Sequence, residues 1–163
     1  MKLNEIKQFA KANSSLIEGL IERTVKEQRE FAFAVLRDKD DKLVPGNILK
    51  GERTIARVPA SILKEAEGVF HTHIEDALPS TADVLVAVIW QHEFLLVGVP
   101  EKKLYCLQVS NELRDKVLET VGSVVSLPLR KQEFMQALFA KLRKELCPLI
   151  ENKVVEISLK EVK

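Results

Sequence analysis

Apolar residues near the amino terminus recur at three- and four-residue spacings, the pattern of one face of an α-helix. This pattern covers residues 3–25 with a break at 13–15, and it predicts one or two amphipathic helices that end before Arg29. Residues 30–36 are short, aromatic and apolar, which is typical of a strand. A charged turn then leads to residues 43–49, the expected hairpin partner, which a Pro-Gly pair interrupts.

Later segments alternate between strand-like and helix-like patterns. Residues 83–91 are apolar on nearly every side, so we expect that helix to be buried against the sheet. Two apolar runs around a four-residue turn, 94–99 and 104–109, predict a β-hairpin. The other expected elements are strands at 53–58, 69–73 and 153–159 and helices at 59–67, 112–120 and 131–146. This order predicts an α/β (α+β) fold in which a mixed sheet is flanked by helices.

Length and charge narrow the class of protein. The 163 residues are enough for a single domain, 1–163, with a core over about 15–125 and a C-terminal helix and strand over about 131–159. A net charge of +1 gives no drive towards nucleic acid or anionic membranes, so neither is an expected partner. Lys and Glu far outnumber Asn and Gln, a bias that leans towards a thermophilic source.

The chain contains two cysteines, Cys106 and Cys147, too few for a disulfide framework. Both lie in apolar surroundings, so we expect two buried, reduced thiols. No apolar run approaches the roughly 20 residues needed to span a bilayer, and the amino terminus lacks an apolar signal-peptide core. These features together predict a cytoplasmic protein.

The segment from His71 to Asp83 contains the candidate metal ligands and a candidate catalytic residue. On a strand, His71 and His73 point to the same face because side chains alternate. Two imidazoles and the carboxylate of Asp83 would give Zn²⁺ three protein ligands and leave a fourth position for water, as in catalytic zinc sites. Ser80, one helical turn before Asp83, could donate a hydrogen bond to the oxyanion that forms when water attacks a carbonyl. A general base must come from a Glu elsewhere in the chain.

Two structural interpretations compete with this one. Ser80 and Asp83 fit a capping box, in which the two side chains satisfy the first backbone donors of a helix. His71 and His73 alone could be two strand histidines without a ligand. The combination within thirteen residues favours a metal site. The third histidine, His92, is expected to be a solvated residue at a helix end.

The stretch Phe-His-Thr-His (70–73) followed by Pro-Ser-Thr-Ala-Asp (79–83) resembles the JAMM, or MPN+, motif of Mov34/MPN-like zinc metallopeptidases of prokaryotic type. The order of the surrounding elements is similar over about residues 15–125. The resemblance implies an MPN fold, which is a cytidine-deaminase-like sandwich. It also implies Zn²⁺ as the cofactor, with His71, His73 and Asp83 as ligands.

The resemblance assigns two catalytic roles as well. Ser80 would stabilise the tetrahedral intermediate, and the catalytic Glu would lie at the start of the first strand. Glu30 is our choice for that Glu, with Glu27 second and Glu22 third. The chain departs from the family pattern in three ways: the His73–Ser80 segment is one residue shorter, Ile74 replaces a Pro, and a Gly after the Glu is missing.

By resemblance, the expected activity is hydrolysis of a peptide or isopeptide bond. The C-terminal tail of a ubiquitin-like or sulfur-carrier protein is the site of cleavage that the resemblance suggests. An exposed strand edge at 43–49 or 94–99 could bind such a tail by backbone pairing. The departures motivate an alternative, a non-catalytic MPN-like scaffold whose apolar face on 131–146 serves a partner. A phosphoesterase is disfavoured because such sites gather more His and Asp ligands than this chain offers.

Overall fold

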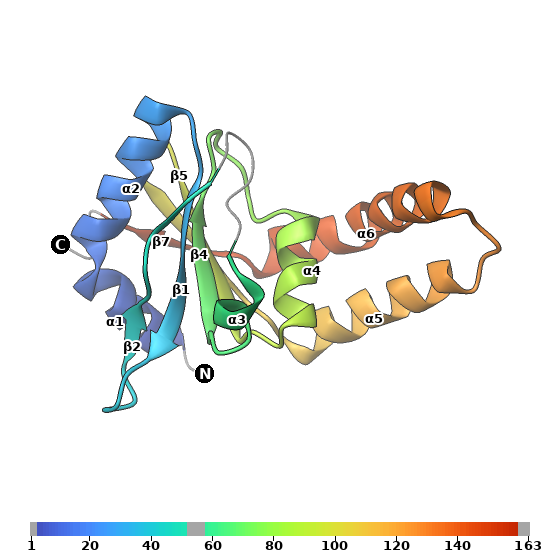
Figure 1. Ribbon diagram of the computed structural model, residues 1–163, viewed down its shortest axis with the longest axis horizontal. Helices are drawn as coiled ribbons and strands as arrows, with labels where there is room; N and C mark the ends of the chain where they lie inside the picture. Colours follow the sequence, from blue (N-terminus) through green and yellow to red (C-terminus); the bar gives the residue numbers. More distant parts are fainter. Residues whose placement is uncertain (1–2, 52–57, 160–163) are drawn as a thin grey trace.

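One mixed sheet with helices on both faces organises the part of the chain that the structure describes (Figure 1). The structure, a computed structural model, describes residues 3–51 and 58–159. Within these ranges, the elements in chain order are α1 Leu3–Ala12, α2 Ser14–Glu27, β1 Phe31–Arg37, β2 Leu43–Pro45, β3 Leu49–Lys50, α3 Ala60–Leu63, β4 Gly68–Thr72, α4 Thr81–Ile89, β5 Phe94–Val99, β6 Lys103–Gln108, α5 Asn111–Val125, α6 Lys131–Lys153 and β7 Val155–Ser158. The predicted α+β class is confirmed.

The strands lie in the order β2-β1-β4-β5-β6-β7, and β3 also pairs with β1. Neighbouring strands are antiparallel except β4 and β5, which run parallel and are connected through α4. The predicted hairpin β5–β6 is confirmed, with Phe94 opposite Gln108 and Val99 opposite Lys103. Because β5 lies between β4 and β6, the expectation of an exposed edge at 94–99 is wrong.

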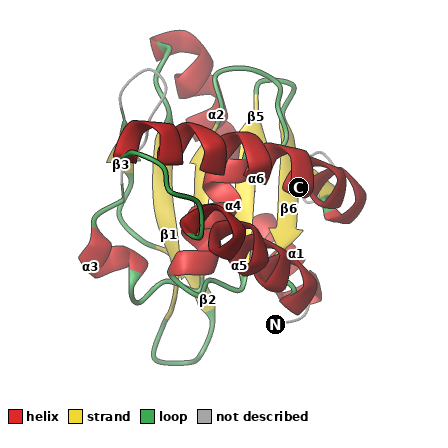
Figure 2. Ribbon diagram, turned by 90° about the vertical axis from the view of Figure 1, so that its right-hand side faces the viewer, coloured by secondary structure: helices red, strands yellow, loops and turns green. Residues whose placement is uncertain are grey.

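Strand β1 shows how the sheet separates two cores. Phe31, Phe33 and Val35 face α1 and α2, where the rings of Phe33 and Phe70 stack with centroids 4.7 Å apart. The residues between them are alanines and point to the opposite face. On that opposite face, α4, α5 and α6 enclose a second core of aliphatic side chains. Figure 2, turned by 90°, shows these three helices in front of the strands.

Helices α5 and α6 form an antiparallel hairpin that extends beyond the sheet (Figure 1). The prediction that the second helix ends at 146 is wrong, because α6 continues through Pro148. Leu146 and Ile150 keep the helical spacing and are buried in the second core, which offsets the cost of about 3 kcal/mol for a proline inside a helix. Within the described residues, none of the helices combines the length and the apolar character that crossing a membrane requires.

Four other predictions concern the burial of α4, the two cysteines, the helix at 59–67 and the strand at 53–58. Helix α4 is not buried on nearly every side, since Val86 and Ile89 are 41% and 61% exposed. Cys106 is buried as expected, but Cys147 is exposed because it lies on the outer side of α6. The helix expected at 59–67 is shorter, ending at Leu63. The strand expected at 53–58 falls largely outside the described residues.

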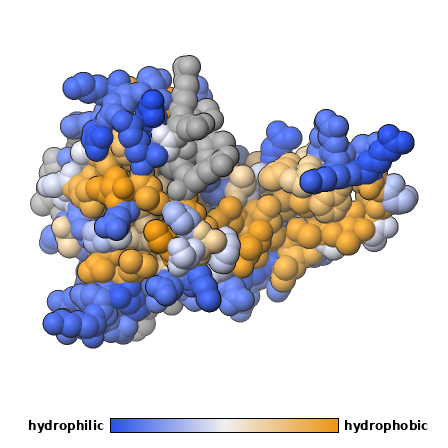
Figure 3. All heavy atoms as spheres, viewed as in Figure 1, coloured by the Kyte–Doolittle hydropathy of each residue, from blue (hydrophilic) through white to orange (hydrophobic). Residues whose placement is uncertain are grey.

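Apolar side chains also remain exposed along the α5–α6 hairpin (Figure 3). The exposed members are Leu118, Val125, Leu127 and Met135. By contrast, Leu138 and Leu142 of α6 are buried, and Phe134 and Phe139 pack against the same core. The apolar face at 131–146 therefore packs mainly on its own domain.

Candidate metal centre

The two imidazoles lie side by side at the carboxyl end of β4. His71 belongs to the strand and His73 follows it by one residue, so both rings project from the same face of the sheet. Their Nε2 atoms are 3.0 Å apart. The backbone N–H of His73 donates to the carbonyl of Gly98 at 2.9 Å, which fixes the chain where the strand ends. His73 Nδ1 lies 3.3 Å from the carbonyl oxygen of Ala77, and a proton on Nδ1 would leave Nε2 unprotonated.

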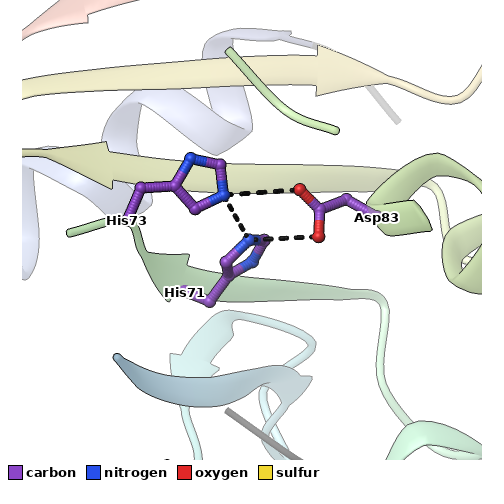
Figure 4. A group of neighbouring side chains, drawn as sticks. All are labelled: His71, His73 and Asp83. Carbon is purple, nitrogen blue, oxygen red and sulfur yellow. Dashed lines mark hydrogen bonds and ion pairs between the residues drawn. The ribbon is translucent and has the colours of Figure 1, made fainter. Parts of the chain in front are cut away.

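Asp83 joins the histidines from the first turn of α4 (Figure 4). Its Oδ1 lies 3.2 Å from His71 Nε2, and its Oδ2 lies 3.5 Å from His73 Nε2. The same carboxylate completes a capping box. The Ser80 N–H donates to Oδ2 at 2.8 Å, and the Asp83 N–H donates to Ser80 Oγ at 3.1 Å. The cap and the cluster are therefore one arrangement and not competing interpretations.

The spacing of these atoms suits a metal ion. A four-coordinate ion with bonds of about 2.1 Å separates its ligand atoms by about 3.4 Å. The two Nε2 atoms are 3.0 Å apart, and His71 Nε2 and His73 Nε2 lie 3.2 and 3.5 Å from the two different oxygens of the Asp83 carboxylate. With one carboxylate oxygen as the third ligand atom, the three atoms all lie within 4.8 Å of one another. All three side chains are largely withdrawn from solvent, and the ligand atoms face one another. This group can hold a metal ion.

His71 and Asp83 lie close enough to shift each other's pKa. Burial alone would lower the pKa of His71, but the Asp83 carboxylate and, more weakly, Glu30 raise it above its usual value. Burial alone would raise the pKa of Asp83, yet the two histidines and the Ser80 N–H hold it well below its usual range. Asp83 is therefore ionised whenever the protein is folded near neutral pH.

Glu30 is held at the start of β1 by its backbone. The Glu30 carbonyl accepts a hydrogen bond from the Gly51 N–H at 2.8 Å, and the following N–H, of Phe31, donates to Thr72 Oγ1 at 2.9 Å. The peptide between Glu30 and Phe31 is thus fixed on both sides. Burial raises the pKa of Glu30, the charges of His71 and His73 partly oppose this shift, and Asp83 adds to it.

The other two candidate bases lie elsewhere. Glu27 forms ion pairs with Arg23 and Lys50, and Glu22 forms one with Lys102. Glu30 lines the same pocket as the metal ligands, whereas Glu27 and Glu22 are not among its described lining residues. Among these three carboxylates, the structure brings Glu30 to the cluster.

A buried pair of threonines, Thr24 and Thr72, supports this geometry and was not among the residues predicted to matter for the site. Thr24 of α2 donates to the Leu20 carbonyl, so the hydroxyl proton of Thr72 points to Thr24 Oγ1. Thr72 Oγ1 in turn accepts the Phe31 N–H. Because Thr72 stands between the two histidines and faces the opposite side of the sheet, this relay connects α2, β1 and β4 beneath the site. The one signal in the sequence was the residue type at position 72, since a threonine hydroxyl can form hydrogen bonds.

The cluster opens into a pocket of about 640 Å³ between the sheet, α3 and α4. Glu30, His71, His73, Ser80 and Asp83 line it on its polar side. Its other described lining residues are mostly aliphatic, and His92 is among them. Substrate-sized pockets with a few converging polar groups are typical of small-molecule and peptide sites.

The expectation of a solvated His92 is wrong. Gln91 adopts φ 57°, which ends α4 and turns the next residue inward. The His92 side chain is 1% exposed, and its Nε2 lies 2.9 Å from the Leu63 carbonyl oxygen. Burial lowers its pKa, so the neutral ring is favoured. His92 lies at the far end of α4 from Asp83 and is not part of the metal cluster.

Compared with protein-family models and with curated proteins, the chain gives no match. The JAMM resemblance therefore stays a prediction from the motif. Function is inferred below from the chemistry of the site, and in particular from the two histidines and the carboxylate that face one another.

Proposed function

We propose that this protein is a zinc-dependent peptidase or isopeptidase that hydrolyses a peptide or isopeptide bond. One observation carries the proposal: three metal-binding atoms converge at the end of β4, and a partly buried carboxylate, Glu30, lines the same pocket. This is the combination of ligand set and nearby base that metal-assisted hydrolysis needs.

The donor set favours zinc among common metals. Two imidazoles with one carboxylate suit Zn²⁺, whereas Mg²⁺ and Ca²⁺ prefer oxygen ligands alone. With His71, His73 and Asp83 as its protein ligands, a fourth coordination position stays open. When bound, zinc would polarise the substrate carbonyl and make water more acidic.

Glu30 is suited to move the proton. In the proposed reaction it takes a proton from the attacking water as the new C–O bond forms. It then gives that proton to the amine nitrogen as the C–N bond breaks. Burial raises the pKa of Glu30, which makes its carboxylate a better proton acceptor, and the clamped peptide beside Phe31 limits how far the carboxylate can move.

Ser80 is placed to stabilise negative charge on the carbonyl oxygen. Its Oγ already accepts a hydrogen bond from the Asp83 N–H, so its own proton remains available to the pocket. Donors aimed at a developing oxyanion typically contribute about 10²–10³-fold to the rate.

An extended peptide is the substrate that the sheet fits best. Strands β2 and β3 lie at one end of the sheet, and β3 pairs with β1 directly beside Glu30, with Lys50 opposite Phe31. A substrate tail could add to this edge by backbone hydrogen bonds. The tail of a ubiquitin-like or sulfur-carrier protein has the required extended form.

Metal analysis and one substitution test the proposal. Protein purified without chelator should contain about one zinc ion per chain. Glu30→Gln should retain that zinc and lose about 10²–10⁴-fold in peptide hydrolysis. Glu27→Gln is the matched control, because Glu27 pairs with Arg23 and Lys50 away from the pocket, and it should remain active. A fully active Glu30→Gln variant would assign the base elsewhere.

A second candidate, a non-catalytic scaffold, is favoured by the apolar side chains exposed on the α5–α6 hairpin, among them Leu118 and Val125. Such a surface is typical of a contact between proteins. Protein purified without any zinc would favour the scaffold, whereas peptide hydrolysis that is lost in Glu30→Gln would favour the enzyme.

A further inference from the structure

The apolar part of the pocket begins on β1. Ala32 stands directly opposite His71 in the sheet, and Ala34 stands opposite Val69. Large side chains of β1 fill the other face, and the small side chain of Ala32 leaves room on the face that carries the histidines. The result is a hollow in the sheet surface immediately beside the metal cluster.

Aliphatic side chains close this hollow on its remaining sides. Val69 and Leu95, paired across β4 and β5, continue the floor away from His71. Val86 and Ala87 of α4 form one wall, and Leu63 of α3 lies at the end. Val86 stays 41% exposed, so its side chain is accessible to a ligand that enters the hollow.

Polar atoms in this part of the pocket are already engaged. His92 is the polar side chain among the described residues at its inner end, and its Nε2 interacts with the Leu63 carbonyl. Burial lowers the pKa of His92, so a positive charge there is disfavoured. A polar or charged guest would therefore lose its hydration without gaining a partner.

We propose, resting on the peptidase function above, that this hollow is a subsite for a bulky aliphatic or aromatic side chain of the substrate, on a residue adjoining the scissile bond. The guest side chain lies against Ala32, Leu63 and Val86 while its backbone reaches the metal cluster. Burial of apolar surface supplies the affinity. The enzyme accordingly discriminates against glycine at this position.

Binding can be measured without metal or turnover. Methyl-labelled, metal-free protein is titrated with N-acetyl-leucinamide and, separately, with N-acetylglycinamide. The leucine probe should cause saturable chemical-shift changes at the methyl groups of Ala32, Leu63 and Val86, and the glycine probe should cause none. Equal shifts with both probes, or no shifts at these methyl groups, would overturn the subsite.

Val86→Glu places a charge on the wall of the hollow and should abolish binding of the leucine probe. Ile89→Glu is the matched control, because Ile89 is an exposed β-branched residue of the same helix that does not line this pocket. The control should bind the probe as the wild-type protein does. Equal loss of binding in both variants would point to a general effect on α4 and contradict the subsite.

Hydrolysis gives a second, separable test. Zinc-loaded protein is offered peptides that carry Leu, Phe or Gly on either side of the cleaved bond. We expect kcat/KM at least about tenfold higher for Leu or Phe than for Gly on one side, the scale of discrimination that apolar pockets provide. Cleavage without such a preference would reject the subsite and leave the peptidase intact. Probe binding without any cleavage would reject the peptidase and leave the subsite.

Discussion

The hydroxyl of Thr72 donates a hydrogen bond to Thr24 across the core, joining helix α2 to the strand that carries His71, a candidate metal ligand. The same hydroxyl accepts the N–H of Phe31, the residue after Glu30. A single buried oxygen therefore helps the β1–β4 pairing to fix the candidate base relative to the candidate ligands. This relation is relevant to catalysis because errors of about 1 Å in a site can cost roughly a hundredfold in rate.

Thr72→Val should destabilise the protein by about 1–3 kcal/mol, because the buried Phe31 N–H loses its acceptor. Zinc content should be unchanged while kcat falls. Thr72→Ser, which restores the hydroxyl, should recover both stability and kcat. The readout that a purely structural role would not move is kcat measured where Thr72→Val is still fully folded. Thr120→Val is the control, since the Thr120 hydroxyl bonds only to a carbonyl of its own helix, that of Lys116. Denaturant unfolding and single-substrate kinetics provide the measurements.

The two roles of Asp83 can be separated. Ser80→Ala removes the side chain that accepts the Asp83 N–H, and it should cost about 1 kcal/mol of stability with zinc retained. Asp83→Asn keeps an oxygen for the Ser80 N–H but loses the charge at the cluster, so stability should change less and zinc affinity should fall sharply. Zinc bound as tightly by Asp83→Asn as by the wild-type protein would remove Asp83 from the ligand set.

The metal-free protein should show a raised pKa for His71, above the usual value of about 6.5. A raised pKa in the folded state means that protonated His71 contributes stability that is fully present below about pH 6.5. This contribution is lost as pH rises through the folded-state pKa. Because zinc competes with the same proton, zinc affinity should increase over that range. Imidazole proton shifts measured by NMR against pH provide the test.

The Asp83→Asn variant gives the corresponding control for this titration. Without the carboxylate, burial is the largest remaining influence on His71, so its pKa should fall. An unchanged titration of His71 in this variant would mean that Asp83 does not interact with it in solution.

Thiol reactivity should distinguish the two cysteines. Cys147 is exposed on α6, whereas Cys106 is buried in β6 and burial raises the pKa of its thiol to about 12. A maleimide reagent should therefore modify Cys147 quickly in the folded protein and reach Cys106 only after denaturation. Mass spectrometry of the labelled protein counts the adducts. Equal labelling of both thiols under native conditions would contradict the placement of Cys106.

Much of the fold followed from local patterns. The alternation in β1, the hairpin at β5–β6 and the spacing of α1 and α2 predicted their elements to within a few residues. The convergence of His71, His73 and Asp83 also followed locally, because strand periodicity and a helix cap fix their directions over thirteen residues.

The features that were predicted wrongly or not at all have one physical cause: tertiary contacts determine them. Thr24 and Thr72 meet although 48 positions separate them. His92 turns inward because Gln91 takes a positive φ, a conformation that a glutamine in the sequence does not predict. The continuation of α6 through Pro148 depends on packing that becomes visible only when the second core is assembled.

Alternate side chains of strand β1 face opposite sides of the sheet and contribute to different features. Odd-numbered positions from Phe31 to Val35 anchor the sheet to α1 and α2, and the even-numbered position Ala32 faces the other way and borders the hollow. A change in the size of Ala32 would therefore reshape the hollow without disturbing the aromatic anchor, although its cross-strand neighbour His71 limits how large the side chain can become. Proteins of this architecture could diverge in the substrates they accept while keeping one reaction centre, and a protein engineer could follow the same route one methyl group at a time.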